Sequence, residues 1–406
     1  MKQSRRHFLL TAGLAAGSMA APQMARAQNA PARDINMRYR TLGRTGLKVS
    51  EVGFGGYPVK DPGVIEYARE KGINYIDAAN CYPRDSELAI GRAIEKRRDD
   101  YVVATKWCPH HIGKEPTKAN FIAQLDDSLR NLRTDHVDIL FNHQLGPSDG
   151  VTRGENFARL DNPELWEAWE TVRQAGKARF FGVSGHEGNL MEVMNHAVDS
   201  GKFDVILCRY NFMNYPTQPD LIKKCAEKNV GFIAMKTLAG ARGADVEGFR
   251  DKFTSFKQAA LKWVLSNPDV SNLIISISDR NQVDEYAVAS GKPLTTADAD
   301  LLREYRQRFD TLVCRMGSEC EPACPYEVRV ADILRAGMYY HEYREETHGL
   351  TEYASIPPAH SGANCAGCAA PCEKACPHHL PIRDLLVTAH ARLQWPGDRR
   401  MLAAGA

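Results

Sequence analysis

The sequence predicts an α/β protein: a closed (βα)8 barrel followed by a small, α-helical, cysteine-rich segment. Short β-rich runs alternate with helical stretches from Tyr39 onward, which is the pattern of a parallel sheet covered by helices. The units number eight over about 250 residues, which is the length and count of a TIM barrel. The alternation stops near residue 310, and seven of the eleven cysteines lie beyond that point.

Length and composition set the limits of this prediction. The 406 residues are enough for two or three domains, and 43% hydrophobic with 25% charged residues is close to the globular average. No internal apolar run approaches the ~20 residues of a membrane span, so a polytopic membrane protein and a disordered chain are both excluded. With 52 basic against 50 acidic residues, the chain is too balanced for nucleic acid to be an expected partner.

Residues 1–27 have the features of an export signal. Arg5 and Arg6 are followed by x-Phe-Leu, a weakly hydrophobic stretch and the small-x-small cleavage site at 25–27. The arginine pair resembles the twin-arginine signal, which is used to export folded proteins, often with cofactors installed. We therefore expect a periplasmic protein that is a transient partner of the twin-arginine translocase. An amphipathic surface helix is the alternative, but the Gly/Ala-rich run argues against it.

We expect the barrel strands at eight β-rich runs, and helices where apolar residues lie three or four apart. An open doubly wound sheet is the alternative, but no Gly-x-Gly-x-x-Gly lies in a strand-to-helix turn. The barrel is expected over residues 37–310 and the cysteine-rich segment over 311–395. The expected strands are 49–54, 74–77, 101–105, 137–141, 178–183, 205–208, 231–235 and 272–277, and the helices include 87–97, 117–132, 163–174, 190–200, 219–228 and 255–266.

Four polar side chains follow successive strands, at the edge where such a barrel carries its chemistry: Asp77, Tyr82, Lys106 and His143. Each has a purely structural explanation when taken alone, but together they form an acid–base device. Tyrosine gives up its proton near pH 10, so its use as an acid requires a nearby cation such as Lys106. A buried lysine needs an anionic partner, which Asp77 can supply. His143 can direct a carbonyl oxygen toward Tyr82, which would protonate it as hydride attacks.

These strand ends and their flanking motifs resemble the aldo/keto reductase family. The resemblance implies a (βα)8 barrel with a nicotinamide cofactor across its C-terminal face. It also implies that Asp77, Tyr82, Lys106 and His143 are the catalytic tetrad. The similar segments lie in family order between about residue 37 and residue 295: 39–50, 72–82, 104–106, 138–143 and 181–185.

The resemblance also implies where the cofactor lies. The motif after the fifth strand would contact the nicotinamide carboxamide, the end of the sixth strand would lie beside it, and the loop after the seventh would bring backbone amides to the diphosphate. Leu207 stands where the family commonly has glutamine. The residues expected in these roles are Ser184, Gly185, Asn211, Lys236 and Leu238.

Two further residues concern the adenosine end of the cofactor. Arg280 is placed for a 2′-phosphate, because a guanidinium fork suits phosphate geometry, and Glu285 could take an adenine edge. This favours NADP over NAD. The alternative is that Arg280 forms a salt bridge with Asp284 on the following helix.

The cysteine run Cys365, Cys368, Cys372 and Cys376-Pro377 is close to the ferredoxin pattern Cys-x2-Cys-x2-Cys-x3-Cys-Pro, with one extra residue before the third cysteine. It predicts one 4Fe-4S cluster, while zinc and disulfides remain alternatives. An upstream run that ends at Cys324-Pro325 resembles a degraded second copy. The cysteine before proline crosses between paired motifs, so the fourth ligand is Cys376 or Cys324.

Together these features resemble a subgroup of aldo/keto reductases that carries a ferredoxin-like segment. The leading hypothesis is an exported, NAD(P)-dependent oxidoreductase that interconverts a small carbonyl and an alcohol, with an iron–sulfur electron-transfer module and a redox partner protein. The alternative is a non-catalytic barrel that acts as a scaffold in an exported electron-transfer complex. The sequence departs from the family's cofactor-binding pattern at Leu207 and in the loop after residue 275, which leaves that alternative open.

Overall fold

The computed structural model describes residues 36–108, 116–143, 158–185, 190–213, 218–239, 252–342 and 345–394. The predicted export signal, residues 1–27, lies outside the described residues. Residues from 35 onward form a compact unit.

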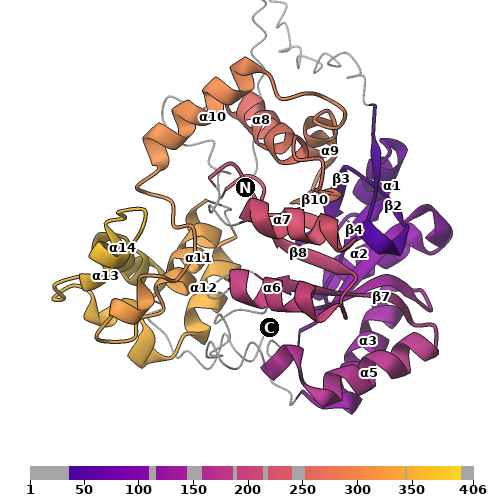
Figure 1. Ribbon diagram of the computed structural model, residues 1–406, viewed down its shortest axis with the longest axis horizontal. Helices are drawn as coiled ribbons and strands as arrows, with labels where there is room; N and C mark the ends of the chain where they lie inside the picture. Colours follow the sequence, from indigo (N-terminus) through magenta and orange to yellow (C-terminus); the bar gives the residue numbers. More distant parts are fainter. Residues whose placement is uncertain are drawn as a thin grey trace, which may run out of the picture. The chain divides into compact units, whose positions relative to one another are not determined.

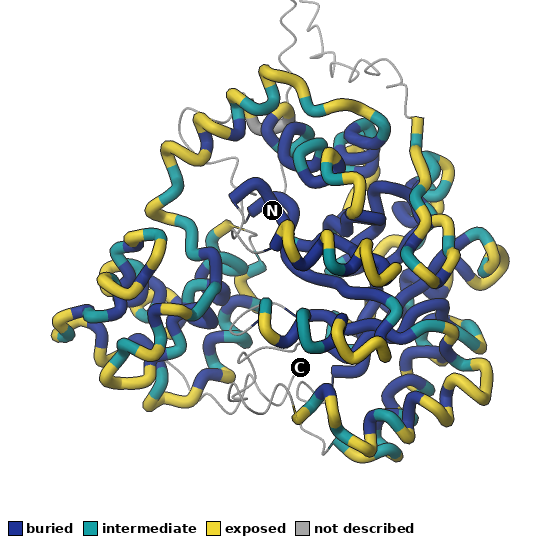
Figure 2. The backbone as a smooth tube through the Cα atoms, in the orientation of Figure 1, coloured by how far each residue is buried: buried dark blue, intermediate teal, exposed yellow. Residues whose placement is uncertain are grey.

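Eight parallel strands close into a barrel, which confirms the predicted (βα)8 architecture (Figure 1). Neighbouring strands follow chain order, and the barrel closes where the last strand pairs with the first. Nearly every strand residue is buried, as expected when side chains fill the inside and helices cover the outside (Figure 2). The strands are β3 (Val52–Gly55), β4 (Tyr75–Asp77), β5 (Val102–Trp107), β6 (Val137–Asn142), β7 (Ala178–Gly185), β8 (Val205–Arg209), β9 (Gly231–Met235) and β10 (Asn272–Ser276).

The helices between the strands bury one apolar face each against the sheet. Their starts follow the capping signals in the sequence: Asn162 accepts a hydrogen bond from Glu164 N, with Pro163 at the first helical position. Helix α5 therefore begins and ends where the sequence predicts. The described helices around the barrel are α1 (Pro62–Glu70), α2 (Arg84–Ile94), α3 (Lys118–Leu132), α5 (Pro163–Gln174), α6 (Leu190–Ser200), α7 (Gln218–Glu227), α8 (Phe253–Leu265), α9 (Arg280–Ala287) and α10 (Thr296–Phe309).

The first expected strand, 49–54, is two strands in the structure. Strand β2 (Lys48–Ser50) pairs antiparallel with β1 (Tyr39–Thr41), and only β3 joins the barrel. The chain bends at Glu51, where Ser50 Oγ donates to Val52 O at 2.7 Å. Because both strands bury their apolar residues, the apolar run gives no sign of this break.

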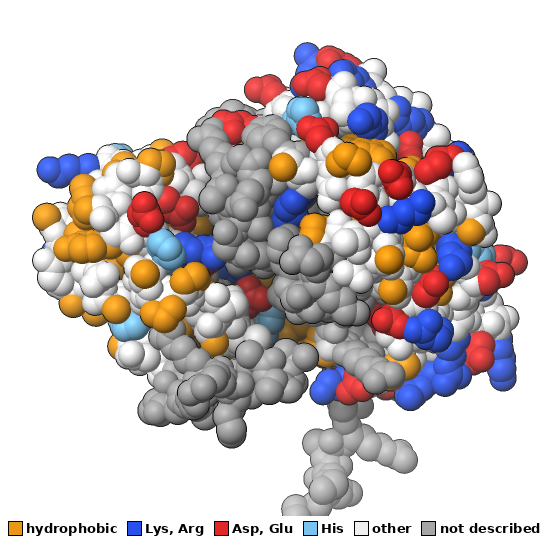
Figure 3. Space-filling model, turned by 90° about the horizontal axis from the view of Figure 1, so that it is seen from below, with side chains coloured by type: hydrophobic (Ala, Val, Ile, Leu, Met, Phe, Trp, Pro, Cys, Tyr) orange, Lys and Arg blue, Asp and Glu red, His pale blue; other side chains and the backbone are white. Residues whose placement is uncertain are grey.

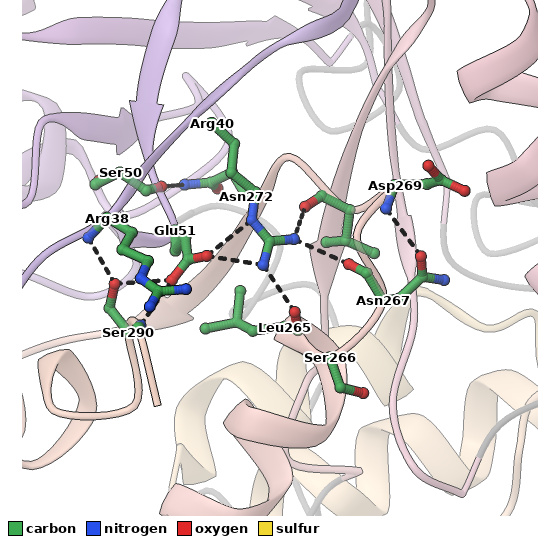
Figure 4. Close-up of polar contacts among 12 residues, drawn as sticks. Arg38, Arg40, Ser50, Glu51, Leu265, Ser266, Asn267, Asp269, Asn272 and Ser290 are labelled. Atoms are coloured by element: carbon green, nitrogen blue, oxygen red, sulfur yellow. Dashed lines mark hydrogen bonds and ion pairs between the residues drawn. The ribbon is translucent and has the colours of Figure 1, made fainter. Parts of the chain in front are cut away.

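A buried charge network fastens the β1–β2 hairpin to the barrel (Figure 4). Arg40 on β1 pairs with Glu51 at 2.7 Å, and Glu51 Oε2 accepts from Ser290 Oγ at 2.9 Å. The same guanidinium donates to three carbonyls at the end of α8 and in the loop before β10. These are the carbonyls of Leu265 at 2.8 Å, Asn267 at 2.9 Å and Val270 at 2.6 Å. The N–H groups of the Arg40 guanidinium thus bind the Glu51 carboxylate and three backbone carbonyls, and these contacts stabilise the region where β10 meets β3.

The segment after α10 is helical, with its own hydrophobic core. Helix α11 packs against α12 and α14, and six cysteines lie in this core or against its edge. The described elements after α10 are all helical, and the ferredoxin-like character of this segment stays a prediction. Its helices are α11 (Val330–His341), α12 (Glu346–Ser355), α13 (Pro371–Ala375) and α14 (Ile382–Leu393), with short turns η5 (Glu321–Ala323), η6 (Pro358–His360) and η7 (Gly362–Asn364).

The described surface mixes charges of both signs. On the face in Figure 3, basic and acidic side chains are interspersed over the barrel. Among the described residues, every helix is too short or too polar to cross a bilayer.

Candidate active site

The structure brings three of the four predicted tetrad residues into direct contact. Lys106 Nζ lies 2.7 Å from Asp77 Oδ2 and 3.0 Å from the Tyr82 hydroxyl, which itself donates to Asp77 Oδ2 at 3.0 Å. Lys106 also donates to the carbonyl of Ala78 at 2.7 Å. Asp77 and Lys106 end neighbouring parallel strands, β4 and β5, so the barrel itself positions them.

Burial decides the electrostatics of this group. Desolvation lowers the pKa of Lys106, although the adjacent Asp77 carboxylate works against that decrease. For Tyr82, burial and the Asp77 carboxylate raise the pKa well above its usual value. The neighbouring lysine by itself would favour the phenolate. In the folded chain desolvation and the carboxylate dominate, so Tyr82 rests as a protonated phenol.

His143, the fourth residue of the tetrad, is oriented by Ser184. His143 Nδ1 lies 2.5 Å from Ser184 Oγ, and both residues are buried at the ends of β6 and β7. A hydroxyl that donates to Nδ1 leaves the proton on Nε2, the nitrogen that can donate to a substrate oxygen. Ser184 was predicted to contact the cofactor carboxamide, and the structure assigns it this contact with His143 as well.

A cavity of about 160 Å³ joins the tetrad to the cysteine-rich segment. Asp77, Tyr82 and His143 line it from the barrel, and helices α11 and α12 line it from the other side. The sequence did not predict that this segment would complete the cavity, since no local pattern relates residues so distant in the chain. The lining residues it contributes are Arg335, Tyr339, Glu345, His348 and Glu352.

An aromatic contact links the two sides of this cavity. Tyr57, after β3, packs edge-on against Tyr82 with ring centroids 5.4 Å apart, and its other neighbour is His348 of α12 at 5.2 Å. Tyr57 was not among the predicted site residues. In the sequence, only its position after the first barrel strand indicated that Tyr57 could lie at the active site.

Most of the predicted cofactor residues that follow strands β7, β8 and β9 surround this cavity or support it. Lys236 and Leu238 line it, and Asn211 Nδ2 donates to the carbonyl of Lys236 at 3.0 Å. Lys236 Nζ lies 3.2 Å from the hydroxyl of Tyr339. Gly185 ends strand β7, where it is buried. Their contacts with a nucleotide stay predictions.

Arg280 and Glu285 lie on α9, outside the cavity. The Arg280 guanidinium stacks over Tyr67 at 5.3 Å, while Asp284 accepts from the Tyr67 hydroxyl at 3.0 Å and pairs with Lys71 at 3.8 Å. The alternative Arg280–Asp284 pair is therefore not formed among the described residues. Glu285 is paired with Lys257 at 2.5 Å, so a bound adenine would have to share the Glu285 carboxylate with Lys257.

A disulfide lies beside the tetrad. Cys81 and Cys108 are joined, with Cα atoms 6.1 Å apart, and Cys81 lines the cavity next to Tyr82. The two cysteines lie 27 residues apart in the sequence, and burial is the default expectation for a free cysteine, so no role was expected for them. With His143 they form the one group of three potential metal ligands within 4.8 Å of one another among the described residues.

The seven tail cysteines carry free thiols and fall into two groups. Cys324 lines a small apolar pocket together with Cys365, Cys368 and Cys372. Cys376 instead interacts electrostatically with Cys314 and Cys320, and Cys320 also interacts with Cys372. Of the two candidates for the fourth cluster ligand, Cys324 is therefore the one that lies with the other three.

Comparison with known proteins agrees with this geometry. The aldo/keto reductase family model matches residues 63–253. L-galactose dehydrogenase of Arabidopsis thaliana is 31% identical over 288 residues, which cover 62% of this chain and 87% of the relative. D-galacturonate reductase of Hypocrea jecorina is 27% identical over 221 residues, which cover 49% of this chain and 67% of the relative.

Solved structures show the same barrel. An aldo-keto reductase from Bacillus halodurans, in its holo form, has a TM-score of 0.52 at 25% identity and covers 66% of this chain and 96% of its own. An aldo-keto reductase from Klebsiella pneumoniae in complex with NADPH has a TM-score of 0.53 at 22% identity and covers 66% and 95%. With its barrel, its tetrad and these relatives, the chain belongs to the aldo/keto reductase family of oxidoreductases.

Proposed function

We propose that this protein interconverts a small carbonyl and an alcohol with NADPH, and that Tyr82 is the proton donor. One observation carries the proposal: at the cavity, the Tyr82 hydroxyl lies 3.0 Å from both Lys106 Nζ and Asp77 Oδ2. A half-buried, protonated phenol next to an ammonium group can deliver a proton to a developing alkoxide.

Each side chain has a distinct task in this reaction. The nicotinamide supplies the hydride when it is bound. His143 Nε2 donates to the carbonyl oxygen and holds it near the Tyr82 hydroxyl. As the alkoxide forms, Tyr82 transfers its proton, and Lys106 stabilises the resulting phenolate. Asp77 keeps Lys106 charged and oriented, because a lone buried ammonium would be costly.

The residues around the cavity fit a nicotinamide nucleotide. Thr237 is buried and lines the cavity, and its Oγ1 has no hydrogen-bond partner among the described residues. A buried hydroxyl of this kind is a ready donor for a bound polar group. Arg280, which forms no pair with Asp284, supports NADP over NAD.

The test is nucleotide oxidation by the purified protein with a panel of small aldehydes, ketones and sugar lactones. Oxidation of NADPH with at least one carbonyl, faster than that of NADH, supports the proposal. Tight NADPH binding with no turnover for any carbonyl in the panel would favour the scaffold alternative.

We also propose one 4Fe-4S cluster, held by Cys365, Cys368, Cys372 and Cys324. The donor set suits it: four free thiols surround one apolar pocket, and Cys324 and Cys368 each accept a backbone N–H at 3.4 Å. Zinc would draw its sulfur ligands to about 3.8 Å from one another, and the described tail cysteines contain no such trio. Labile sulfide with about four iron atoms per cluster supports this proposal, whereas about one zinc without sulfide would refute it.

Export through the twin-arginine pathway to the periplasm, and a redox partner protein there, complete the proposed role. Both rest on the sequence of residues 1–27 and on the need to load a cluster before export. Cell fractionation tests this directly. Periplasmic protein whose export is lost when Arg5 and Arg6 are replaced by lysine supports it, and cytoplasmic retention of the unmodified protein contradicts it.

A further inference from the structure

The cysteine-rich segment contains the same local structure twice. The short turn η5 is bounded by Cys320 and Cys324, and the short helix α13 contains Cys372 and ends at Cys376. Both closing cysteines precede proline and have nearly the same backbone angles, φ −81° and ψ 118° at Cys324 and φ −76° and ψ 118° at Cys376. The two elements pack against each other. They are therefore paired copies of one unit.

Side-chain contacts repeat along with the backbone. Glu321 Oε1 accepts from Ala331 N at 3.0 Å, at the start of α11, and Glu373 Oε1 accepts from Arg383 N at 3.0 Å, at the start of α14. Each copy thus caps the helix that follows it in the same way. Left-handed residues also recur at matching places: Ser318 and Ala370 before the turns, and Glu327 and His379 after them.

The copies differ at one ligand position. The second copy has cysteines at 365, 368 and 372, whereas the first has Cys314, Gly317 and Cys320. The first copy keeps the ferredoxin spacing Cys-x2-Cys-x2-Cys-x3-Cys-Pro, except that Gly317 stands in place of the second cysteine. The first site therefore retains two cysteines of its own.

The last cysteine of each copy lies with the cysteines of the other copy. Cys324 of the first copy lies with the three cysteines of the second, and Cys376 of the second lies with Cys314 and Cys320. Each group receives its final cysteine from the other copy. This leaves a second site of three thiols beside the four-cysteine site.

A carboxylate lies where the missing cysteine would be. A Cβ atom built on Gly317 would lie 2.0 Å from Glu319 Oε2 and 2.6 Å from its Oε1. The exposed Glu319 carboxylate thus lies where the Cβ atom of a residue at position 317 would be. Carboxylate oxygen is an accepted ligand for iron, although harder than thiolate.

We propose that Cys314, Cys320 and Cys376 hold a second iron–sulfur cluster, with the Glu319 carboxylate at the iron that lacks a thiolate. This inference rests on the proposed cluster at the four-cysteine site. Cys314 also lines a cavity of about 360 Å³ that Arg209, Asn211 and Lys236 of the barrel share. Cys314 therefore places the proposed site on the barrel side of the segment.

The first experiment counts iron and labile sulfide in the full-length protein purified anaerobically, together with Cys314→Ser and Cys368→Ser. We expect about seven to eight iron atoms per chain, with about half lost in each variant and a different electron paramagnetic resonance signal retained in each. About four iron atoms, lost in Cys368→Ser and unchanged in Cys314→Ser, would overturn the second cluster alone. Absence of sulfide in every sample would overturn both clusters.

The second experiment restores the missing ligand. Gly317 has no left-handed φ, and the atoms nearest to a Cβ at this position belong to the flexible Glu319 side chain, so Gly317→Cys is compatible with the fold. We expect iron of the second cluster to leave at least tenfold more slowly under a chelator in Gly317→Cys, and faster in Glu319→Gln. The control is Glu327→Gln, an 84% exposed glutamate of the same segment, which should match the unmodified protein. Unchanged loss of iron in both site variants would overturn the role of position 317 and Glu319.

Discussion

Lys106 Nζ lies 2.7 Å from Asp77 Oδ2, and each side chain is only 1% exposed. Removal of one partner would leave the other charge buried and unpaired. We therefore expect Asp77→Asn to lower the free energy of unfolding by about 3–5 kcal/mol.

Chemical denaturation, followed by circular dichroism, measures this change. The control is Glu170→Gln, which breaks an ion pair to Arg173 whose side chains are about half exposed, 48% and 50%. Such a surface pair contributes about 0–1 kcal/mol. Equal, small losses in both variants would mean that the Asp77–Lys106 pair is hydrated in solution.

The pH dependence of reduction should reflect the raised pKa of Tyr82. Burial and Asp77 move this pKa well above its usual value near 10, so the phenol keeps its proton through the neutral and alkaline range. We expect kcat for carbonyl reduction to show no decline from loss of this proton below about pH 10. A decline centred near about pH 8 at saturating carbonyl would contradict this expectation.

The same shift has a consequence for stability. The folded pKa of Tyr82 lies above that of the unfolded chain, so the unfolded chain binds fewer protons once the pH passes about 10. The contribution of Tyr82 to stability is therefore complete below about pH 10 and is lost as the pH rises further. Comparison of unfolding midpoints for the unmodified protein and Tyr82→Phe above and below that pH measures it.

The Cys81–Cys108 disulfide closes a loop that carries Tyr82. Its loss frees a segment of the unfolded chain, so Cys108→Ala should lower the free energy of unfolding by about 3 kcal/mol under oxidising conditions. The unmodified protein treated with a thiol reductant should show a similar loss, and reductant should have little further effect on the variant. A reductant effect of equal size in both proteins would contradict a disulfide between these cysteines.

Cofactor preference should depend on Arg280. If its guanidinium binds the 2′-phosphate, Arg280→Ala should weaken NADPH binding about 10- to 100-fold and leave NADH binding nearly unchanged. Arg303→Ala is the control, because that arginine pairs with Asp300 on the exposed surface of α10. Titration calorimetry with both nucleotides measures the affinities. An equal loss for the two nucleotides would remove the phosphate contact.

The sequence predicted most of the barrel because its signals are local. Alternation of β-rich and helical runs located the strands, and Asn162 with Pro163 marked the start of α5. The bend at Glu51 was hidden, since the buried residues on both sides of it form one apolar run. Periodicity records burial, and it does not record which sheet a buried strand joins.

The candidate active site was likewise predictable only where its residues are positioned by neighbouring strands. Asp77 and Lys106 could be placed together because neighbouring parallel strands end at one edge of a barrel. The contacts of Tyr339 and His348 with this cavity depend on how the cysteine-rich segment packs, and no local pattern encodes them. Similarly, spacing left Cys324 and Cys376 as alternatives, and their separation required the paired packing of η5 and α13.

The role of Tyr82 is tested most directly by Tyr82→Phe, which removes one oxygen atom and keeps the ring. We measure carbonyl reduction and NADPH affinity, with Tyr101→Phe as a control at the opposite end of strand β5. Loss of proton donation predicts a kcat about 10²- to 10⁴-fold lower in Tyr82→Phe, with NADPH affinity retained and Tyr101→Phe fully active. A Tyr82→Phe enzyme that turns over within about twofold of the unmodified protein would contradict proton transfer by this phenol.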